Sequence, residues 1–406
     1  MRPKLTDLFS AAAVKRLASV ETSDSRSNQH EFNGVASLRK VFGSDRETVP
    51  TVFLLFDDEE VWRDEGTLTW YDARERTPDR SEFRCYFSAN DAMRRAGPGD
   101  LVLVARRTDG QGAVVIVAPR GSTAERQLAF MLGDPLIDAR FAEAALGSGE
   151  FRNIEAVERM LVEEIVGAVG LATGSGADES PDSTLARRAA SRFGGRMPPA
   201  SELSQVAREW FASDPSSDPD AAILRWMDGE EQIFRAIERP EVIARIRSGF
   251  AEDVDEFIGF ATSVLNRRKS RAGTALESHV AEVLRVRGIP FEAQAQTERR
   301  SRVDFLIPGL DAYREDAVDQ ERVLMLAVKR TCKDRWRQVL AEASRLRTKH
   351  LLTLEPAISE HQTAEMQSHG VRLVVPRPIH GTFAETQRLW LLTVGAFVDM
   401  AQRATR

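Results

Sequence analysis

Short apolar or alternating runs separated by turn signals characterise residues 48–120. The runs are TVFLLF (51–56), TLTWY (67–71), FRCYF (83–87), LVLVA (101–105) and AVVIVA (113–118). Gly97-Pro98-Gly99-Asp100 and Asp109-Gly110 stand between them as turn sequences. Regularly spaced short strands of this kind are typical of a small sheet or barrel. We therefore predict a mostly-β N-terminal domain over residues 1–172, with a loosely ordered polar stretch at 22–34 and helical spacing over 141–172.

The chain then becomes rich in small and turn-forming residues. LATGSGADESPDST (171–184) contains many Gly, Ser and Asp residues, and FGGRMPPAS (193–201) adds Gly and Pro. Such composition is typical of a connecting segment. We place a linker at 173–202.

A second pattern begins after the linker, in which helical periodicity alternates with short buried runs. The predicted helices cover 202–211, 220–238, 240–248, 253–265, 274–287, 334–349 and 385–402. The predicted strands are VDFLI (303–307), VLMLAV (323–328), HLLTL (350–354) and VRLVVP (371–376). Strands that alternate with helices favour an α/β domain, with helices on the faces of a central sheet, over residues 203–406.

Composition narrows the class of protein. The 406 residues are 42% hydrophobic and 29% charged with a net charge of -6, so nucleic acid could be met only by local basic patches. The two cysteines, Cys85 and Cys332, fit a reduced compartment. The chain shows no signal peptide, no membrane-length apolar run and no zinc or P-loop motif, so we expect a cytoplasmic protein without a membrane partner.

Lysine usage singles out one segment. Only seven of the 56 basic residues are lysines, and two of them, Lys329 and Lys333, lie within AVKRTCKDRW (327–336). An ammonium is a compact charge that can approach a single oxygen, unlike a guanidinium. A chain that otherwise uses arginine therefore has a chemical reason for lysine at the end of an apolar strand.

Four residues of the C-terminal domain could form a hydrolytic site. Asp304 lies in one predicted strand, Lys329 follows the next, and Glu342 lies on the predicted helix after it. Glu277 lies near the start of the predicted helix over 274–287. Two carboxylates can hold Mg²⁺, and a neighbouring ammonium can stabilise charge on a phosphate. The set therefore fits magnesium-assisted hydrolysis of a phosphodiester.

Each residue also has a structural interpretation. Asp304 could pair with a nearby arginine, Lys329 and Lys333 could be solvated, and Glu342 could pair with Arg345 on the helix surface. Thr274-Ala-Leu-Glu277 fits a capping box, in which the glutamate bonds back to the helix start. The residues alone leave these alternatives open.

The C-terminal domain resembles the catalytic domain of EcoRII-type restriction endonucleases, which are PD-(D/E)XK nucleases that cut duplex DNA with Mg²⁺. The resemblance rests on DEFI (255–258), NRRKSRAG (266–273), DFL (304–306), LAVKRTCKDRWRQ (326–338), GVRLVVP (370–376) and LTVGAF (392–397). It implies a restriction-endonuclease-like mixed central sheet flanked by helices, preceded by a DNA-binding pseudobarrel.

The resemblance also implies roles for individual residues. Asp304 and Glu342 would be metal ligands, and Lys329 the catalytic lysine. Glu277 and Lys333 match further positions linked to the site, the latter with Asp334. Two positions depart from the superfamily pattern, since Val303 replaces its proline and Ala327 replaces an acid. The second departure makes activity depend on Glu342 as the replacement acid.

Two groups of residues are predicted to bind DNA. In the catalytic domain they are Arg267, Arg268, Lys269, Arg271, Lys333, Asp334, Arg335 and Arg337, whose basic members suit phosphates or guanine edges. In the N-terminal domain the resemblance implies a second, effector copy of the DNA site, at Trp70, Tyr71, Arg74, Arg76 and Arg80. Solvated charged loops are the alternative for both groups.

The resemblance implies a type II restriction endonuclease that acts as a homodimer on double-stranded DNA. A cognate DNA methyltransferase would be its functional, not physical, partner. Two other functions remain open. One is a non-cleaving DNA-binding regulator, favoured by Ala327, and the other is a repair or defence nuclease that reads structure or modification.

Overall fold

A computed structural model describes residues 5–22, 30–33, 35–58, 60–74, 81–132, 141–144, 165, 183–250, 253–298, 301–315, 321–332 and 335–406. The described chain divides into two compact units. The first comprises Met1–Asp178 with Pro356–Ala364, and the second comprises Glu179–Glu355 with Glu365–Arg406.

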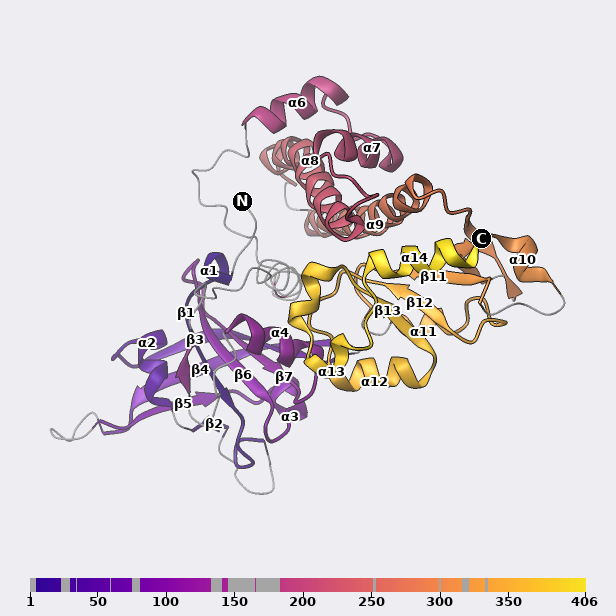
Figure 1. Ribbon diagram of the computed structural model, residues 1–406. Coiled ribbons are helices and arrows are strands. Elements are labelled where there is room, and N and C mark those ends of the chain that lie inside the picture. Colours follow the sequence, from indigo (N-terminus) through magenta and orange to yellow (C-terminus); the bar gives the residue numbers. More distant parts are fainter. Residues whose placement is uncertain are drawn as a thin grey trace. The chain divides into compact units, whose positions relative to one another are not determined.

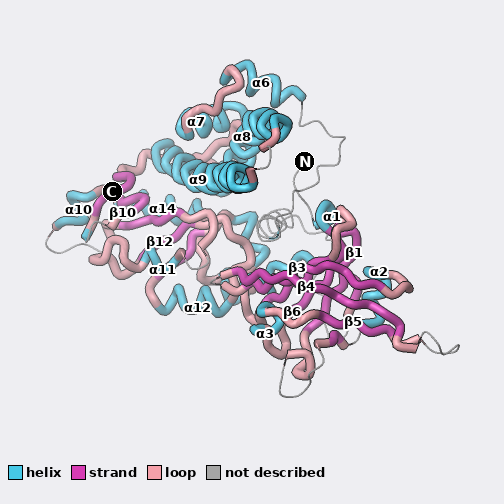
Figure 2. Tube along the Cα trace, turned by 180° about the vertical axis from the view of Figure 1, so that it is seen from behind, coloured by secondary structure: helices cyan, strands magenta, loops and turns pink. Residues whose placement is uncertain are grey.

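The first unit contains one curled eight-stranded sheet that resembles half of a barrel (Figure 2). Its strands are β1 (Phe9–Arg16), β2 (Glu31–Phe32), β3 (Glu47–Phe56), β4 (Val61–Asp72), β5 (Phe83–Phe87), β6 (Leu101–Arg107), β7 (Ala113–Ala118) and β8 (Ala142–Glu143). Their order across the sheet is β2-β5-β4-β3-β7-β6-β1-β8. All five strands predicted in this region are present, which confirms the mostly-β N-terminal part. The sequence pattern did not reveal β1, β2 or β8.

Strands β6 and β7 are buried on both faces of the sheet. Successive side chains of a strand point to opposite faces, so neighbouring residues of β6 enter different apolar clusters. Leu101, Leu103 and Ala105 of β6 belong to one apolar cluster. Val102 and Val104 belong to the other. Helices cover the faces: α1 (Leu5–Leu8), α2 (Arg39–Phe42), α3 (Asp91–Arg95) and α4 (Thr123–Met131), with the 3₁₀ helix η1 (Val35–Leu38). This double burial explains why β6 and β7 read as continuous apolar runs.

The second unit combines a helical part with a mixed five-stranded sheet (Figure 1). Its helices are α6 (Ser183–Phe193), α7 (Ala200–Trp210), α8 (Pro219–Ser248), α9 (Val254–Val286), α10 (Leu310–Arg314), α11 (Trp336–Val339), α13 (Glu385–Arg388) and α14 (Val394–Ala404), with the 3₁₀ helix η3 (Arg377–Thr382). Helix α12 (Glu360–Ser368) has residues in both units.

The sheet of the second unit is ordered β13-β12-β11-β10-β9. Its strands are β9 (Glu292–Gln296), β10 (Arg302–Ile307), β11 (Leu324–Val328), β12 (Lys349–Leu352) and β13 (Val371–Val374). Strands β11, β12 and β13 are parallel, while β10 is antiparallel to both β9 and β11. Helix α14 packs on one face, where Phe397 meets His350, and α11 lies on the other (Figure 1). The predicted α/β class and four predicted strands are confirmed, and β9 is an addition.

Two long helices replace several shorter predicted ones. Helix α8 runs through Pro240, and α9 runs through the basic stretch 266–273, which the sequence pattern had suggested as a break. Aspartate caps begin both helices, since Asp218 and Asp253 accept hydrogen bonds from Ala221 and Glu256 N–H groups. Neither the basic stretch nor Thr274 therefore marks a helix end.

Part of the predicted linker is structured. Within 173–202, residues 183–193 form α6, and Ala189 of this helix shares an apolar cluster with Leu203, Val206 and Ile233 of α7 and α8. The apolar side of α6 thus belongs to the helical part of the second unit. The helix predicted over 141–172 falls mostly outside the described residues, which include Ala142–Glu143 as a strand.

Candidate nuclease site

Asp304 and Lys329 meet because their strands are neighbours. In the antiparallel pairing of β10 with β11, Phe305 lies opposite Leu326. The Asp304 carboxylate accepts hydrogen bonds from Lys329 Nζ at 2.9 Å and from the Val328 backbone N–H at 2.7 Å. Both side chains are largely buried, which strengthens the attraction between their charges. The structure therefore places this predicted pair together at one site.

Glu277 reaches the same site from α9. The Gln294 amide donates to Glu277 Oε2 at 3.1 Å and to Asp304 Oδ1 at 3.2 Å. Burial, and then the negative charge of Asp304, raise the pKa of Glu277. The capping-box interpretation is wrong, because Thr274 lies inside a continuous helix and its hydroxyl donates to the Ser270 carbonyl.

Glu342 lies in a turn, not on the predicted helix over 334–349. Helix α11 ends at Val339, and Ala343 takes a φ of 42°. The Lys349 ammonium donates to the backbone carbonyls of Glu342, Ala343 and Leu346, at 2.6, 2.9 and 3.2 Å. These carbonyls turn toward a buried cation instead of continuing a helical ladder, which explains the wrong helix prediction.

The Glu342 carboxyl is buried near the pair. Its Oε2 has no hydrogen-bond partner among the described residues. Burial raises its pKa to about 7, while Lys329 opposes that rise and Asp304 adds to it. The influence of both charges puts Glu342 within electrostatic reach of Asp304 and Lys329.

These donors suit a hard cation that retains water. In the described part of the chain, no three His, Cys, Asp or Glu side chains group closely enough to hold a metal. Mg²⁺ needs only one or two carboxylates, because waters complete its shell. The buried oxygen of Glu342, without a hydrogen-bond partner among the described residues, is the observation that fits a role in holding a cation. Asp304 and Glu342 are the residues that could hold one.

The segment after Lys329 is fixed by residues that the sequence pattern did not reveal. The Lys329 N–H donates to the Leu352 carbonyl, and the Thr353 hydroxyl donates to the Arg330 carbonyl. The Cys332 N–H donates to the buried Glu355 carboxylate at 2.6 Å. Glu355 thus holds the loop that carries the lysine. Its only sequence signal is a lone acid among apolar residues.

Lys333 and Asp334 lie outside the described residues. Arg335 and Arg337 follow them and are exposed, as expected for residues that could meet a phosphate. The Arg337 guanidinium lies 3.2 Å from the Glu365 carboxylate.

The arginines of α9 are engaged within the protein. Arg267 and Arg268 form ion pairs with the buried carboxylate of Glu238 on α8. Arg267 also pairs with Glu241, and Arg271 donates to the Pro198 carbonyl. The alternative interpretation of 266–273 as a solvated loop is wrong, since the segment is helical and Arg267 and Arg268 connect α9 to α8. The side chain of Lys269 is not among those described.

Trp70 is not a contact for effector DNA. Its side chain is fully buried, stacks on Phe83 and donates to the Gly43 carbonyl, so that prediction is wrong. A strand residue beside an exposed loop can point to the core, because alternate positions face opposite sides. Arg76 and Arg80 lie outside the described residues.

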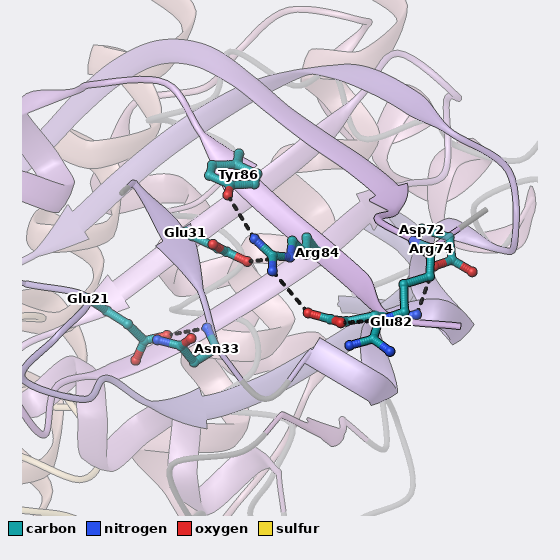
Figure 3. A network of polar contacts seen from close by, with 8 residues as sticks. All are labelled: Glu21, Glu31, Asn33, Asp72, Arg74, Glu82, Arg84 and Tyr86. Carbon is teal, nitrogen blue, oxygen red and sulfur yellow. Dashed lines mark hydrogen bonds and ion pairs between the residues drawn. The ribbon is translucent and has the colours of Figure 1, made fainter. Parts of the chain in front are cut away.

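A polar and aromatic surface does occur beside Trp70, on β4 and β5. Figure 3 shows Arg84 between Tyr86, Glu31 and Glu82. Arg74 pairs with Glu82 at 2.7 Å, and Tyr71 stacks on Tyr86 with ring centres 6.1 Å apart. Tyr71 and Arg74 keep their predicted place at the surface. Arg84 and Tyr86 are additional residues of this surface that sequence reasoning missed.

The mixed sheet thus carries a buried carboxylate–lysine pair, with Asp304 on β10 and Lys329 directly after β11. Residues 234–398 match the family described as EcoRII C terminal. The match therefore includes the mixed sheet and the residues Asp304, Lys329 and Glu342.

One curated protein is similar to part of this chain in sequence, and two solved structures are similar to part of it in fold. The type II restriction enzyme EcoRII of Escherichia coli is 45% identical over 204 residues, which are 50% of each chain. The chain therefore matches about half the length of this curated relative. Two solved structures overlap it with a TM-score of 0.43 and 18% identity. They are metal-depleted Ecl18kI in complex with uncleaved, modified DNA, over 56% of this chain and 86% of that one, and a PspGI–substrate DNA complex, over 52% and 93%.

Proposed function

We propose that the protein is a type II restriction endonuclease that hydrolyses phosphodiester bonds of double-stranded DNA with Mg²⁺. The carrying observation is the buried Asp304–Lys329 pair, with Glu277 and Glu342 beside it. The 45% identity to a type II restriction enzyme across this region supports the assignment.

Each residue of the site has a role in this proposal. Asp304 and Glu342 would hold the cation, and Glu277 would add negative charge on the α9 side. Lys329, oriented by Asp304, places an ammonium where the phosphate gains charge in the transition state. A bound Mg²⁺ would supply a Lewis acid and lower the pKa of its water. Glu342 stands in for the acid that is absent at Ala327.

DNA would be held by charges around this site. Arg335 and Arg337 are exposed and follow the segment of Lys329, and Lys333 and Asp334 directly precede Arg335 in the sequence. Arg267, Arg268, Lys269 and Arg271 remain proposed contacts, although the described arginines among them must exchange or share their internal partners. Phosphate contacts of this kind make binding depend on salt.

The proposal extends to regulation. Tyr71 and Arg74, with Arg76 and Arg80, would bind a second copy of the DNA site at the N-terminal unit. The active form would be a homodimer, and a cognate methyltransferase would protect host DNA. The domain limits 1–172, 173–202 and 203–406 remain part of this proposal, and the linker 173–202 then contains α6, which packs on helices of the catalytic domain.

The test uses the full chain, Mg²⁺ and unmethylated genomic DNA, followed by sequencing of the ends. Restriction predicts one short palindrome at every end, and the same DNA methylated at that sequence should resist cleavage. Scattered ends would indicate the repair or defence nuclease instead. Binding without any Mg²⁺-dependent product would indicate the non-cleaving regulator.

A further inference from the structure

One neutral side chain lies between two of the site's acids. Gln294 of β9 donates from the same amide nitrogen to Glu277 and Asp304, which come from different elements. We propose that Gln294 is a positioning residue that orients the Asp304 carboxylate for a divalent cation and holds the Glu277 carboxylate beside it. This inference rests on the proposed function, since it concerns the same site.

The strand register explains how Gln294 reaches Asp304. Val303 pairs with Ala295, and Phe305 pairs with Ala293, so position 294 lies opposite Asp304 in the antiparallel pair. Directly opposed side chains of neighbouring strands lie on the same face, about 5 Å apart at Cβ. Glu277 approaches that face from α9.

A primary amide suits the position between two carboxylates. Its NH₂ group has two hydrogens, and one can go to each carboxylate. Two carboxylates in a partly buried site repel, and the shared donor offsets part of that repulsion. Because the amide is neutral, it does not compete with a cation for charge, as an ammonium would. Asp304 Oδ2 already accepts from Lys329, so the amide orients the second oxygen, Oδ1.

The backbone at Gln294 is unusual for a strand. Its φ is 53°, in the left-handed region. Among the described residues other than glycine, only Gln294, Ala343 and Ala357 have a positive φ, and Ala343 directly follows Glu342. Such a conformation is unfavourable for a residue with a Cβ atom and persists where the surroundings require it. Here it coincides with two hydrogen bonds to site carboxylates, although the residue is largely exposed.

Substitutions at Gln294 should affect the stability of the fold and the affinity for a cation differently. If Gln294 serves the site, Gln294→Gly should relieve the backbone cost and raise the melting temperature while weakening cation binding. Gln294→Ala should weaken binding without stabilising the fold. Gln294→Asn tolerates the left-handed backbone and keeps a shorter amide, so it should bind better than the alanine variant.

The experiment titrates the full-length protein with Mn²⁺, a probe for oxygen-ligand sites, and follows free Mn²⁺ by electron paramagnetic resonance. Loss of an orienting group typically reduces metal affinity 10- to 100-fold, so we expect at least about a tenfold loss for Gln294→Ala. Gln296→Ala, an exposed glutamine on the same strand, is the matched control and should bind as wild type does. Thermal unfolding of each variant reports its folding separately.

The outcomes separate the two proposals. Wild-type Mn²⁺ affinity in Gln294→Ala would overturn the role of Gln294 and leave the proposed function intact. Equal losses in Gln294→Ala and Gln296→Ala would also overturn it, because the effect would belong to the strand. Failure of the wild-type protein to bind Mn²⁺, with or without DNA, would remove the proposed metal chemistry together with this inference.

Discussion

Lys329 shows at the scale of one residue why an ammonium differs from a guanidinium. Its nitrogen lies 2.9 Å from one oxygen of Asp304, in a site bordered by Glu277 and Glu342. A planar guanidinium spreads its charge over a larger group and presents a fork of donors. The arginine that serves elsewhere in this chain therefore does not fit the role proposed for Lys329.

Lys329→Ala should lower the single-turnover cleavage rate by about 10²- to 10³-fold, as expected for loss of one group that stabilises the transition state. Lys329→Arg should not restore the rate. Binding to the same duplex, measured by gel shift in Ca²⁺, should persist in both variants. Cleavage at the wild-type rate by Lys329→Ala would contradict the proposed site.

Glu342 should make the stability of the metal-free protein depend on pH. Burial raises the pKa of its carboxyl from 4.5 to about 7. The folded state keeps the proton over this range while the unfolded chain loses it. Stability is therefore lost as the pH rises from about 4.5 to 7. The full effect is roughly 3 kcal/mol, at 1.36 kcal/mol per pKa unit.

Glu342→Gln removes this contribution, because the amide does not ionise. With EDTA present, urea unfolding should show that the unfolding free energy of the variant increases relative to that of the wild type between pH 5 and pH 8. An unchanged difference in unfolding free energy at the two pH values would contradict the buried, raised carboxyl. Mg²⁺ should reduce the difference in unfolding free energy between variant and wild type at pH 8. The metal binds the ionised carboxylate and so stabilises the folded wild-type protein.

At the scale of the element, the turn between α11 and β12 shows a local pattern being overridden. Trp336, Val339, Leu340, Ala343 and Leu346 follow helical spacing, yet the helix ends at Val339. Lys349 is buried at the start of β12 and draws three carbonyls of the turn to its ammonium. The turn, and with it Glu342, is therefore organised by a residue outside the apparent helix.

Lys349→Met should cost about 2–4 kcal/mol of unfolding free energy, because it leaves buried carbonyls of the turn without their donor. Denaturant unfolding measures this cost. Arg335→Met, an exposed change before the same turn, is the control and should lie within about 0.5 kcal/mol of wild type. A Lys349→Met protein as stable as the control would show that the turn forms without the ammonium.

At the scale of the whole molecule, each unit has its own apolar core, and each carries a separate candidate surface for DNA. The first unit presents Tyr71, Arg74 and Arg84 beside β4 and β5, while the second contains the carboxylate–lysine site. In the described residues, no helix is long and apolar enough to cross a membrane. The proposed control by a second DNA copy requires such a second surface.

A plasmid with two recognition sites should be cut faster than one with a single site, and a short duplex carrying the site should activate cleavage of the latter. The double variant Tyr71→Ala with Arg74→Ala should lose that activation and retain basal cleavage. Arg63→Ala, which removes an exposed ion pair with Glu65 elsewhere on β4, is the matched control. Full activation of the double variant would contradict an effector role for this surface.

The sequence by itself determined the α/β class of the second unit and five strands of the first, and it singled out Asp304, Lys329, Glu277 and Glu342 as candidate site residues. Buried strands and a segment as unusual as AVKRTCKDRW are local features, so a linear pattern can reveal them. Tertiary structure decided the rest. It made α9 continuous, buried Trp70, ended α11 early and placed Gln294, Lys349 and Glu355 beside the functional segments. These outcomes depend on which distant group supplies a hydrogen bond or covers a face, and such partners are not visible in local periodicity.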